Sequence, residues 1–125
     1  MIDHLTDTNV FSEIFKGNAD VKKFVKSVEN SIDSTVCVEC LQGSKSNREK
    51  LIIKKYLSRF PIYYHTPSIS KQTIALIDQY SNSHGLFLPD AQIASVCLEY
   101  DLTLITYNVG DFKFIKGLKW LKPNV

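Results

Sequence analysis

Four acidic residues each stand where an apolar run ends or where a helix is expected to begin. They are Asp7, Glu39, Asp90 and Asp111, and together they span most of the 125-residue chain. Carboxylate oxygens are the ligands that hard divalent cations take from proteins. If the fold gathers these side chains, they form a site for one or two such cations.

The residues between these acids predict strands that alternate with helices. Short β-branched or apolar runs favour strands, and apolar residues at helical spacing favour helices. The expected strands are residues 2–6, 35–38, 62–64 and 102–106. The expected helices are residues 10–15, 19–30, 46–58, 68–83 and 89–100, with a short one at 111–115 ahead of 118–121. This alternation implies an α/β fold with a parallel sheet.

A parallel sheet of this kind binds ligands in the crevice outside the carboxyl ends of its strands. Asp7, Glu39 and Asp111 are expected to follow strands directly, so the fold would bring them to this edge. Asp90 is expected to enter the same region from the start of a helix. The other interpretation is that Asp7 and Asp90 are ordinary first-turn acids favoured by the helix dipole, with Glu39 a solvated helix residue.

Asp90 ends an otherwise apolar stripe of its expected helix. At spacings of three, four and seven residues it shares a face with Ile93, Ala94 and Cys97. Burying an unpaired carboxylate costs several kcal/mol, so this side chain requires a cation, a base or water. A metal ion in the crevice would meet that requirement.

The composition is that of one domain comprising residues 1–125. Hydrophobic residues make up 44% of the chain, and no repeat, low-complexity stretch or linker marks a boundary. No apolar run reaches the roughly 20 residues that span a bilayer, and the N-terminus lacks the features of a secretory signal. We therefore expect a soluble, cytoplasmic protein that does not enter a membrane. The cysteines are odd in number, and Cys37 and Cys40 are expected in a buried strand and its exit, which favours reduced thiols.

Basic residues outnumber acidic ones once the four clustered acids are set aside. The remaining nine acidic residues then face 15 basic ones, which leaves a surface charge of about +6. The bases gather in two groups, Lys45, Arg48, Lys50, Lys54, Lys55 and Arg59, and Lys113, Lys116, Lys119 and Lys122. An anionic substrate whose phosphates contact these residues is consistent with this pattern. The alternative is that both groups are solvated faces of amphipathic elements.

Taken in order, these segments resemble the PIN-domain family. The matching segments are Asp7-Thr8-Asn9-Val10, Glu39 with Gly43, Asp90-Ala91-Gln92-Ile93-Ala94 and Thr106-Tyr107-Asn108-Val109-Gly110-Asp111-Phe112. The likeness covers nearly the whole chain and extends to the VapC-type toxins of type II toxin–antitoxin pairs. It implies a three-layer α/β/α sandwich with a central parallel sheet, and an endoribonuclease that uses Mg²⁺ or Mn²⁺. It also implies a homodimer inhibited by a partner antitoxin.

The resemblance also implies roles for individual residues. Carried over by position, Asp7, Glu39 and Asp90 are the core acidic residues, and Asp7 and Asp90 contact the metal directly. The remaining ligand is Asp111, which charge favours, or Asn108, which position favours. All five are therefore candidate metal ligands.

Three polar residues resemble those that hold the acids of the family in place. They are Thr8, Asn9 and Thr106, for which ordinary hydrogen bonding in turns and at strand ends is the alternative. The expected chemistry needs no protein nucleophile, because a water activated by a carboxylate-held metal attacks the phosphorus of RNA in line with the leaving oxygen. The products would carry 5′-phosphate and 3′-hydroxyl ends.

Other assignments of the same residues lead to different functions. His4, His65 and His84 could serve as general acid and base without metal, although His4 and His65 have no evident partner. The Cys37-x-x-Cys40 pair could bind zinc, but it lacks a second ligand pair, so core packing is favoured. Asp7-Thr8-Asn9-Val10 also resembles the first motif of the haloacid dehalogenase-like phosphatases, with Asn9 where that motif has a second aspartate. A non-cleaving PIN-like module that binds RNA or protein is the remaining alternative.

Overall fold

The computed structural model describes residues 1–125 and is organised around one five-stranded sheet. Its strands are β1 (His4–Thr6), β2 (Asn30–Asp33), β3 (Ile62–Tyr63), β4 (Thr103–Ile105) and β5 (Lys119–Leu121). They lie in the order β3-β2-β1-β4-β5, and every neighbouring pair is parallel. The chain therefore extends the sheet in one direction through β3 and then returns to add β4 on the other side of β1.

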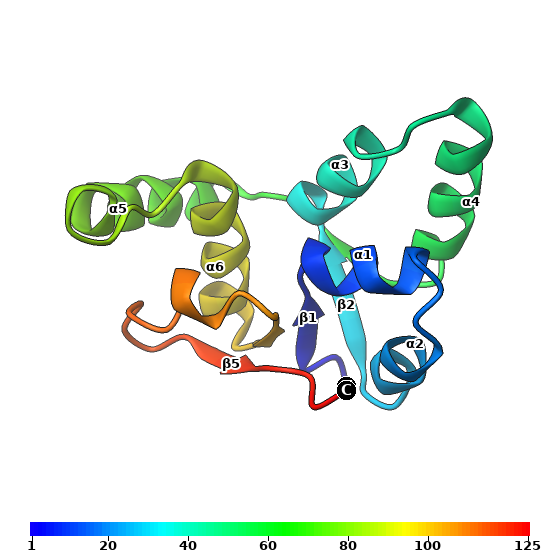
Figure 1. The fold of residues 1–125 in the computed structure, drawn as a ribbon. Helices are drawn as coiled ribbons and strands as arrows, with labels where there is room; N and C mark the ends of the chain where they lie inside the picture. Colours follow the sequence, from blue (N-terminus) through cyan, green and yellow to red (C-terminus); the bar gives the residue numbers. More distant parts are fainter.

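Helices connect the strands and cover the sheet on both faces. They are α1 (Thr8–Phe15), α2 (Ala19–Lys26), α3 (Ser34–Gln42), α4 (Asn47–Leu57), α5 (Pro67–His84), α6 (Leu88–Tyr100) and the 3₁₀ turn η1 (Val109–Asp111). Figure 1 shows α5 and α6 on one side of β1 and β2, with α1, α2 and α4 on the other. This arrangement confirms the predicted α/β fold with a central parallel sheet. No helix is both long and apolar enough to cross a bilayer.

The core lies between the central strands and the helices on each face. Leu5 of β1, Ile32 of β2 and Leu104 of β4 are buried, as expected for parallel strands that are covered on both sides. Phe11 of α1 and Ile93 of α6 fill the two faces and are also fully buried. The carboxyl ends of β1 and β4 are therefore held by the buried core of the protein.

The prediction of a strand at residues 35–38 is wrong, because these residues lie in α3. The true strand is β2, one segment earlier, whose sequence is Asn30-Ser31-Ile32-Asp33 and whose four residues are all buried. Its polar side chains are satisfied individually. The Thr6 hydroxyl donates to Asn30 Oδ1, and the Ser31 hydroxyl donates to the His4 carbonyl. Because most residues of this strand are polar and their buried groups are hydrogen-bonded, the strand lacks the apolar pattern on which the prediction depends.

Local capping explains why residues 35–38 are helical. Asp33 is the N-cap of α3, and its carboxylate accepts a hydrogen bond from the Val36 N–H over 2.9 Å. This bond satisfies one of the free N–H groups of the first helical turn, which outweighs the β preference of a short β-branched run. Cys37 and Cys40 are consequently helical, whereas the sequence predicts them in a strand and at its exit.

Smaller differences concern the ends of elements. Helix α2 ends at Lys26 rather than at Asn30, and α5 has Thr66 as its N-cap rather than starting at Ser68. Gly85 ends α5 in the left-handed conformation, with φ of 69°, as the predicted stop required. The short helix predicted at 111–115 is instead the single turn η1, which ends at Asp111.

The hydrogen bond between β1 and β2 gives a test of the buried polar strand. Thr6 and Asn30 are both buried, so Thr6→Val leaves Asn30 Oδ1 without its donor. We expect this variant to lower the free energy of unfolding by about 1–3 kcal/mol, measured by urea denaturation. Thr103→Val is the matched control, because Thr103 lies in neighbouring β4 and its hydroxyl makes no hydrogen bond in the structure. Equal losses for the two variants would contradict this account of β2.

Candidate active site

The carboxyl ends of β1 and β4 meet at the point where the chain changes direction in the sheet. Asp7 follows β1 and Thr106 follows β4, and the Asp7 N–H donates to the Ile105 carbonyl over 2.9 Å. A crevice forms at such a position in parallel sheets, because the connections from the two neighbouring strands leave on opposite faces. Asp7 therefore occupies the predicted edge of the sheet.

The Asp7 carboxylate is held by donors from both halves of the chain. Its Oδ2 accepts hydrogen bonds from the Thr106 hydroxyl at 2.8 Å and from Asn9 Nδ2 at 2.9 Å. Its Oδ1 accepts the Thr8 N–H at 2.7 Å, which makes Asp7 the N-cap of α1. With only 5% of its surface exposed, the carboxylate has its orientation fixed by these three donors.

Asn9 and Thr106 are themselves held, so the donors to Asp7 do not move independently. Asn9 Nδ2 also donates to the Thr106 hydroxyl oxygen at 3.1 Å, and Asn9 Oδ1 accepts the Tyr107 N–H at 2.9 Å. The Asn108 N–H donates to the same Thr106 oxygen at 3.0 Å. The contacts join residues 7–9 to residues 106–108 in one network. They are the contacts expected of residues that orient an acidic ligand.

Glu39 reaches this network from α3 rather than from the end of a strand, which corrects its predicted position. The Thr8 hydroxyl donates to Glu39 Oε1 over 2.7 Å. Glu39 lies in the second turn of α3, whose start is fixed by the Asp33 cap. Thr8 thus sets the position of Glu39, while the backbone N–H of the same residue contacts Asp7.

Asp90 enters from the first turn of α6, as predicted, and it carries the strongest sign of charge crowding. Burial, and after it the carboxylates of Asp7, Asp111 and Glu39 in that order, together raise its pKa to about 7. Below it, Ile93, Ala94 and Cys97 are buried at the predicted spacing. The structure therefore brings Asp7, Asp111 and Glu39 within electrostatic range of Asp90.

The pKa of Asp7 is also raised, to about 6. Burial is the main cause, and the Glu39 charge adds to it, while the hydrogen bonds from Thr106, Thr8 and Asn9 oppose it. None of the four acids has an ion-pair partner among the basic side chains. The cluster thus carries negative charge that no basic group of the protein offsets.

Asp111 and Asn108 both lie in the loop that follows β4. The structure separates Asp111 from the end of the strand by five residues, so it does not follow the strand directly as predicted. Both side chains are exposed. The charge of Asp111 reaches Asp90, whereas the backbone of Asn108 is tied to Thr106. Both therefore remain candidate ligands.

The donor set suits a hard divalent cation such as Mg²⁺ or Mn²⁺. Carboxylates without basic partners, partly buried and mutually repulsive, are relieved by a cation of this type. No three of the His, Cys, Asp and Glu side chains stand close enough together to hold one ion without movement. Exposed Asp111 and half-buried Glu39 and Asp90 can move toward an ion, whereas Asp7 is fixed.

One functional candidate, Asp33, was missed by the sequence analysis. Asp33 is fully buried at the end of β2, and its Oδ2 lies 2.8 Å from Nε2 of His65. His65 therefore has a partner, contrary to expectation, and so does His4, whose Nδ1 contacts Asp3. The available signal was the spacing from Asp33 to Val36, which is that of a helix cap.

The cysteines pack in or against the core. All three are free, and Cys40 and Cys97 are buried. Burial raises the pKa of the Cys40 thiol to about 12 and that of Cys97 well above its usual value, so both remain protonated. A protonated, buried thiol is a weak metal ligand and a poor nucleophile. This geometry agrees with the core-packing interpretation.

The raised pKa values of Asp7 and Asp90 predict how stability changes with pH without metal. Because the folded protein holds these protons more tightly than the unfolded chain, their stabilising effect is complete below about pH 4 and is lost as the pH rises through 6 and 7. Relative to wild type, Asp90→Asn should therefore gain stability as the pH rises from 4 to 8 in EDTA. Urea denaturation at each pH measures this difference. Asp78→Asn, at an exposed position of α5, should show no trend, and a flat difference for Asp90→Asn would contradict the crowded cluster.

The chain is similar to known proteins along nearly its whole length. The family described as PIN domain matches residues 5–116. A structure titled as a toxin–antitoxin complex from Klebsiella pneumoniae has a TM-score of 0.79 and 29% identity, covering 93% of this chain and 95% of that chain. No curated protein matches the chain.

Two further solved structures share the fold at lower sequence identity. DNA-bound VapBC from Salmonella typhimurium has a TM-score of 0.84 and 20% identity, covering 98% of each chain. VapBC2 from Rickettsia felis, bound to a DNA fragment from their promoter, has a TM-score of 0.80 and 23% identity, covering 99% of this chain and 100% of that chain. The family match and the acid-bearing sheet edge agree, and the chain belongs to the PIN domain family.

Proposed function

We propose that this protein is a VapC-type toxin that hydrolyses RNA as an endoribonuclease dependent on Mg²⁺ or Mn²⁺. The observation that carries the proposal is the buried Asp7 carboxylate, fixed by Thr106 and Asn9 beside acids that lack basic partners. Membership of the PIN domain family supports a nuclease. The toxin assignment is supported by solved structures titled as toxin–antitoxin or VapBC complexes.

The residues divide the work according to their positions. Asp7 and Asp90 would hold the metal, with Glu39 and either Asp111 or Asn108 completing the set. When bound, the ion supplies a Lewis acid that offsets phosphate charge and lowers the pKa of water. Thr106 and Asn9 keep one Asp7 oxygen occupied, and the Thr8 hydroxyl keeps Glu39 near the cluster. The protein contributes preorganisation at Asp7, because three hydrogen bonds already fix this carboxylate before charge develops on the phosphate.

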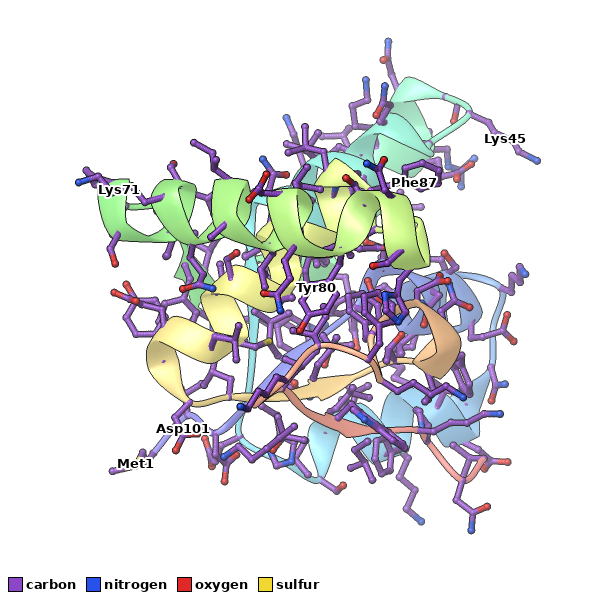
Figure 2. All side chains as sticks on the ribbon, turned by 90° about the vertical axis from the view of Figure 1, so that its left-hand side faces the viewer. Met1, Lys45, Lys71, Tyr80, Phe87 and Asp101 are labelled. Atoms are coloured by element: carbon purple, nitrogen blue, oxygen red, sulfur yellow. The ribbon has the colours of Figure 1, made fainter.

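The basic residues of α4 and the turn before it would contact the RNA backbone. Lys45 extends outward from the turn between α3 and α4 (Figure 2). Arg48, Lys50, Lys54 and Lys55 are exposed on α4. Because α3 carries Glu39 and packs against α4, these bases flank the helix that supplies one of the acids. Phosphates bound along α4 would lead the strand toward the carboxylates.

The proposal includes a partner protein. We infer that residues 1–125 act as one PIN domain, as a homodimer in the cytoplasm, and that a cognate antitoxin keeps the enzyme silent. A guanidinium from the antitoxin would suit the acid cluster, because arginine pairs with carboxylates through two parallel hydrogen bonds. The absence of any basic partner for the four acids supports this inference.

A non-cleaving RNA-binding module is the second candidate. It is favoured by one observation, the spacing of the acids, since no three of the candidate side chains stand close enough to hold an ion as they are. Such a module would bind RNA through the basic residues and leave it intact. The two candidates differ in the products formed from RNA and in the response to metal.

Cleavage of total cellular RNA by the purified protein tests the proposed activity. With Mg²⁺ or Mn²⁺ we expect discrete cuts that leave 5′-phosphate and 3′-hydroxyl ends, and none in EDTA. Asp90→Asn should slow cleavage by on the order of 100-fold or more, because it removes a charge that only the ion balances. Asp78→Asn is the matched control and should cut like wild type. RNA binding without cutting, in antitoxin-free protein, would favour the second candidate.

Metal binding can be measured separately from activity. At a Mn²⁺ concentration about 100 times its Kd, the ion should stabilise the folded protein by about 2.7 kcal/mol. Thermal unfolding at pH 8 should therefore show a higher Tm with Mn²⁺ than in EDTA. Glu39→Gln and Asp90→Asn should reduce this increase, whereas Asp78→Asn should not. An equal increase in all four proteins would place the ion elsewhere.

A further inference from the structure

A pocket of about 320 Å³, lined mostly by polar residues, adjoins the acid cluster, and apart from Glu39 its lining has no role in the reaction described above. Helix α3 contributes Thr35, Glu39 and Gln42 to its lining, α6 contributes Pro89 and Gln92, and His65 comes from the segment after β3. Glu39 belongs to both the pocket and the acid cluster. Asp90 lies between Pro89 and Gln92 in the sequence, so a ligand in the pocket would lie beside the site of cleavage.

His65 is held in the pocket wall by a fully buried carboxylate. Its Nε2 lies 2.8 Å from Asp33 Oδ2 and 3.4 Å from the Thr35 hydroxyl oxygen. A carboxylate accepts hydrogen bonds, so Nε2 carries the proton in this pair. Asp33 is in turn fixed through Oδ1 by the Val36 N–H. Nδ1 of His65 makes no hydrogen bond within the protein and is the nitrogen left for a ligand.

Gln92 is oriented by the next contact in the same chain of hydrogen bonds. The Thr35 hydroxyl donates to Gln92 Oε1 over 3.0 Å, and Thr35 is itself buried. The Gln92 amide NH₂ group makes no hydrogen bond within the protein, and neither does the side chain of exposed Gln42. At His65 and Gln92 the pocket therefore presents polar groups whose directions are set by buried partners, as in a preorganised binding site.

The chemistry of the lining selects a neutral, planar ligand. Neither lysine nor arginine lines the pocket, and Glu39 lies in it, so a phosphate is disfavoured. The Pro89 ring and the His65 imidazole offer flat surfaces for stacking. The volume of the pocket is at the lower end of the roughly 300–1,000 Å³ range of small-ligand pockets. Unpaired bases in RNA are recognised in this way, by stacking and by hydrogen bonds to their edges.

We propose that this pocket binds one unpaired base of the RNA next to the cleaved phosphate, and that Gln92, Gln42 and His65 determine which base is preferred. This inference rests on the proposed ribonuclease function. The free NH₂ group of Gln92 favours guanine or uracil, which present O6 or O4 at the ring position where adenine and cytosine carry an amino group. The pocket would thus set the sequence at which the enzyme cuts.

Cleavage of a randomised RNA pool, with every cut end sequenced, tests this proposal. Wild type with Mn²⁺ should show at least a fivefold preference for guanine or uracil at one position beside the cut. Gln92→Ala should reduce that preference to less than twofold at the same position only. Gln92→Glu replaces the donors by acceptors and should shift the preference toward adenine or cytosine. Gln79→Ala, at an exposed position of α5, should leave both the rate and the preference unchanged.

The outcomes separate this proposal from the function on which it rests. If wild type cuts no RNA, the ribonuclease function fails and the base pocket fails with it. If wild type cuts but shows no preference beside the cut, or if both Gln92 variants keep the wild-type preference, only the base pocket is overturned. Gln42→Ala supplies a second test at an exposed position, where loss of folding is not a concern, and should reduce the same preference at least twofold. An unchanged preference in Gln42→Ala would remove Gln42 from the specificity set.

Discussion

The rest of the site depends on one interaction, the hydrogen bond between the Thr106 hydroxyl and the buried Asp7 carboxylate. It joins the residue after β1 to the residue after β4, so it forms only when these strands pair in the correct register. Asn9 completes the link by contacting both side chains. Sheet pairing, the direction of α1 and the placement of the first acid are thereby set by a single constraint.

The acid cluster lowers the stability of the metal-free protein, and the packing of the remaining fold offsets this loss. Burial and mutual repulsion raise the pKa values of Asp7 and Asp90, which means that their charged forms destabilise the metal-free protein. Around them the packing is regular. Aromatic rings of Phe11, Tyr56 and Phe60 form edge contacts on one face, while Tyr80 projects from α5 toward the C-terminal segment and accepts the Lys116 N–H (Figure 2). An unfavourable cluster of charges that is confined to one site and supported by a regular core is characteristic of functional positions.

The sequence was informative where one physical effect dominated. Alternating apolar patterns predicted the parallel α/β fold, and the apolar stripe below Asp90 placed it in α6. Prediction failed where effects competed. At Thr35-Val36-Cys37-Val38 a β-branched run suggested a strand, but the Asp33 cap made the segment helical. That error placed Glu39 after a strand and concealed β2, whose polar residues are paired by contacts that only the tertiary structure reveals. The pairing of Asp33 with His65 is likewise a contact that only the tertiary structure reveals.

The two halves of the Asp7 network are separated by almost the entire length of the chain. Residues 7–9 leave the ribosome first, and residues 106–108 can reach them only after the intervening helices and strands have emerged. Contacts between such distant segments form late in folding, because the entropy of closing a long loop must be overcome before they add stability. A nascent or truncated chain that lacks β4 therefore cannot assemble the acid site. The acid site can therefore form only after residues 106–108 have been synthesised.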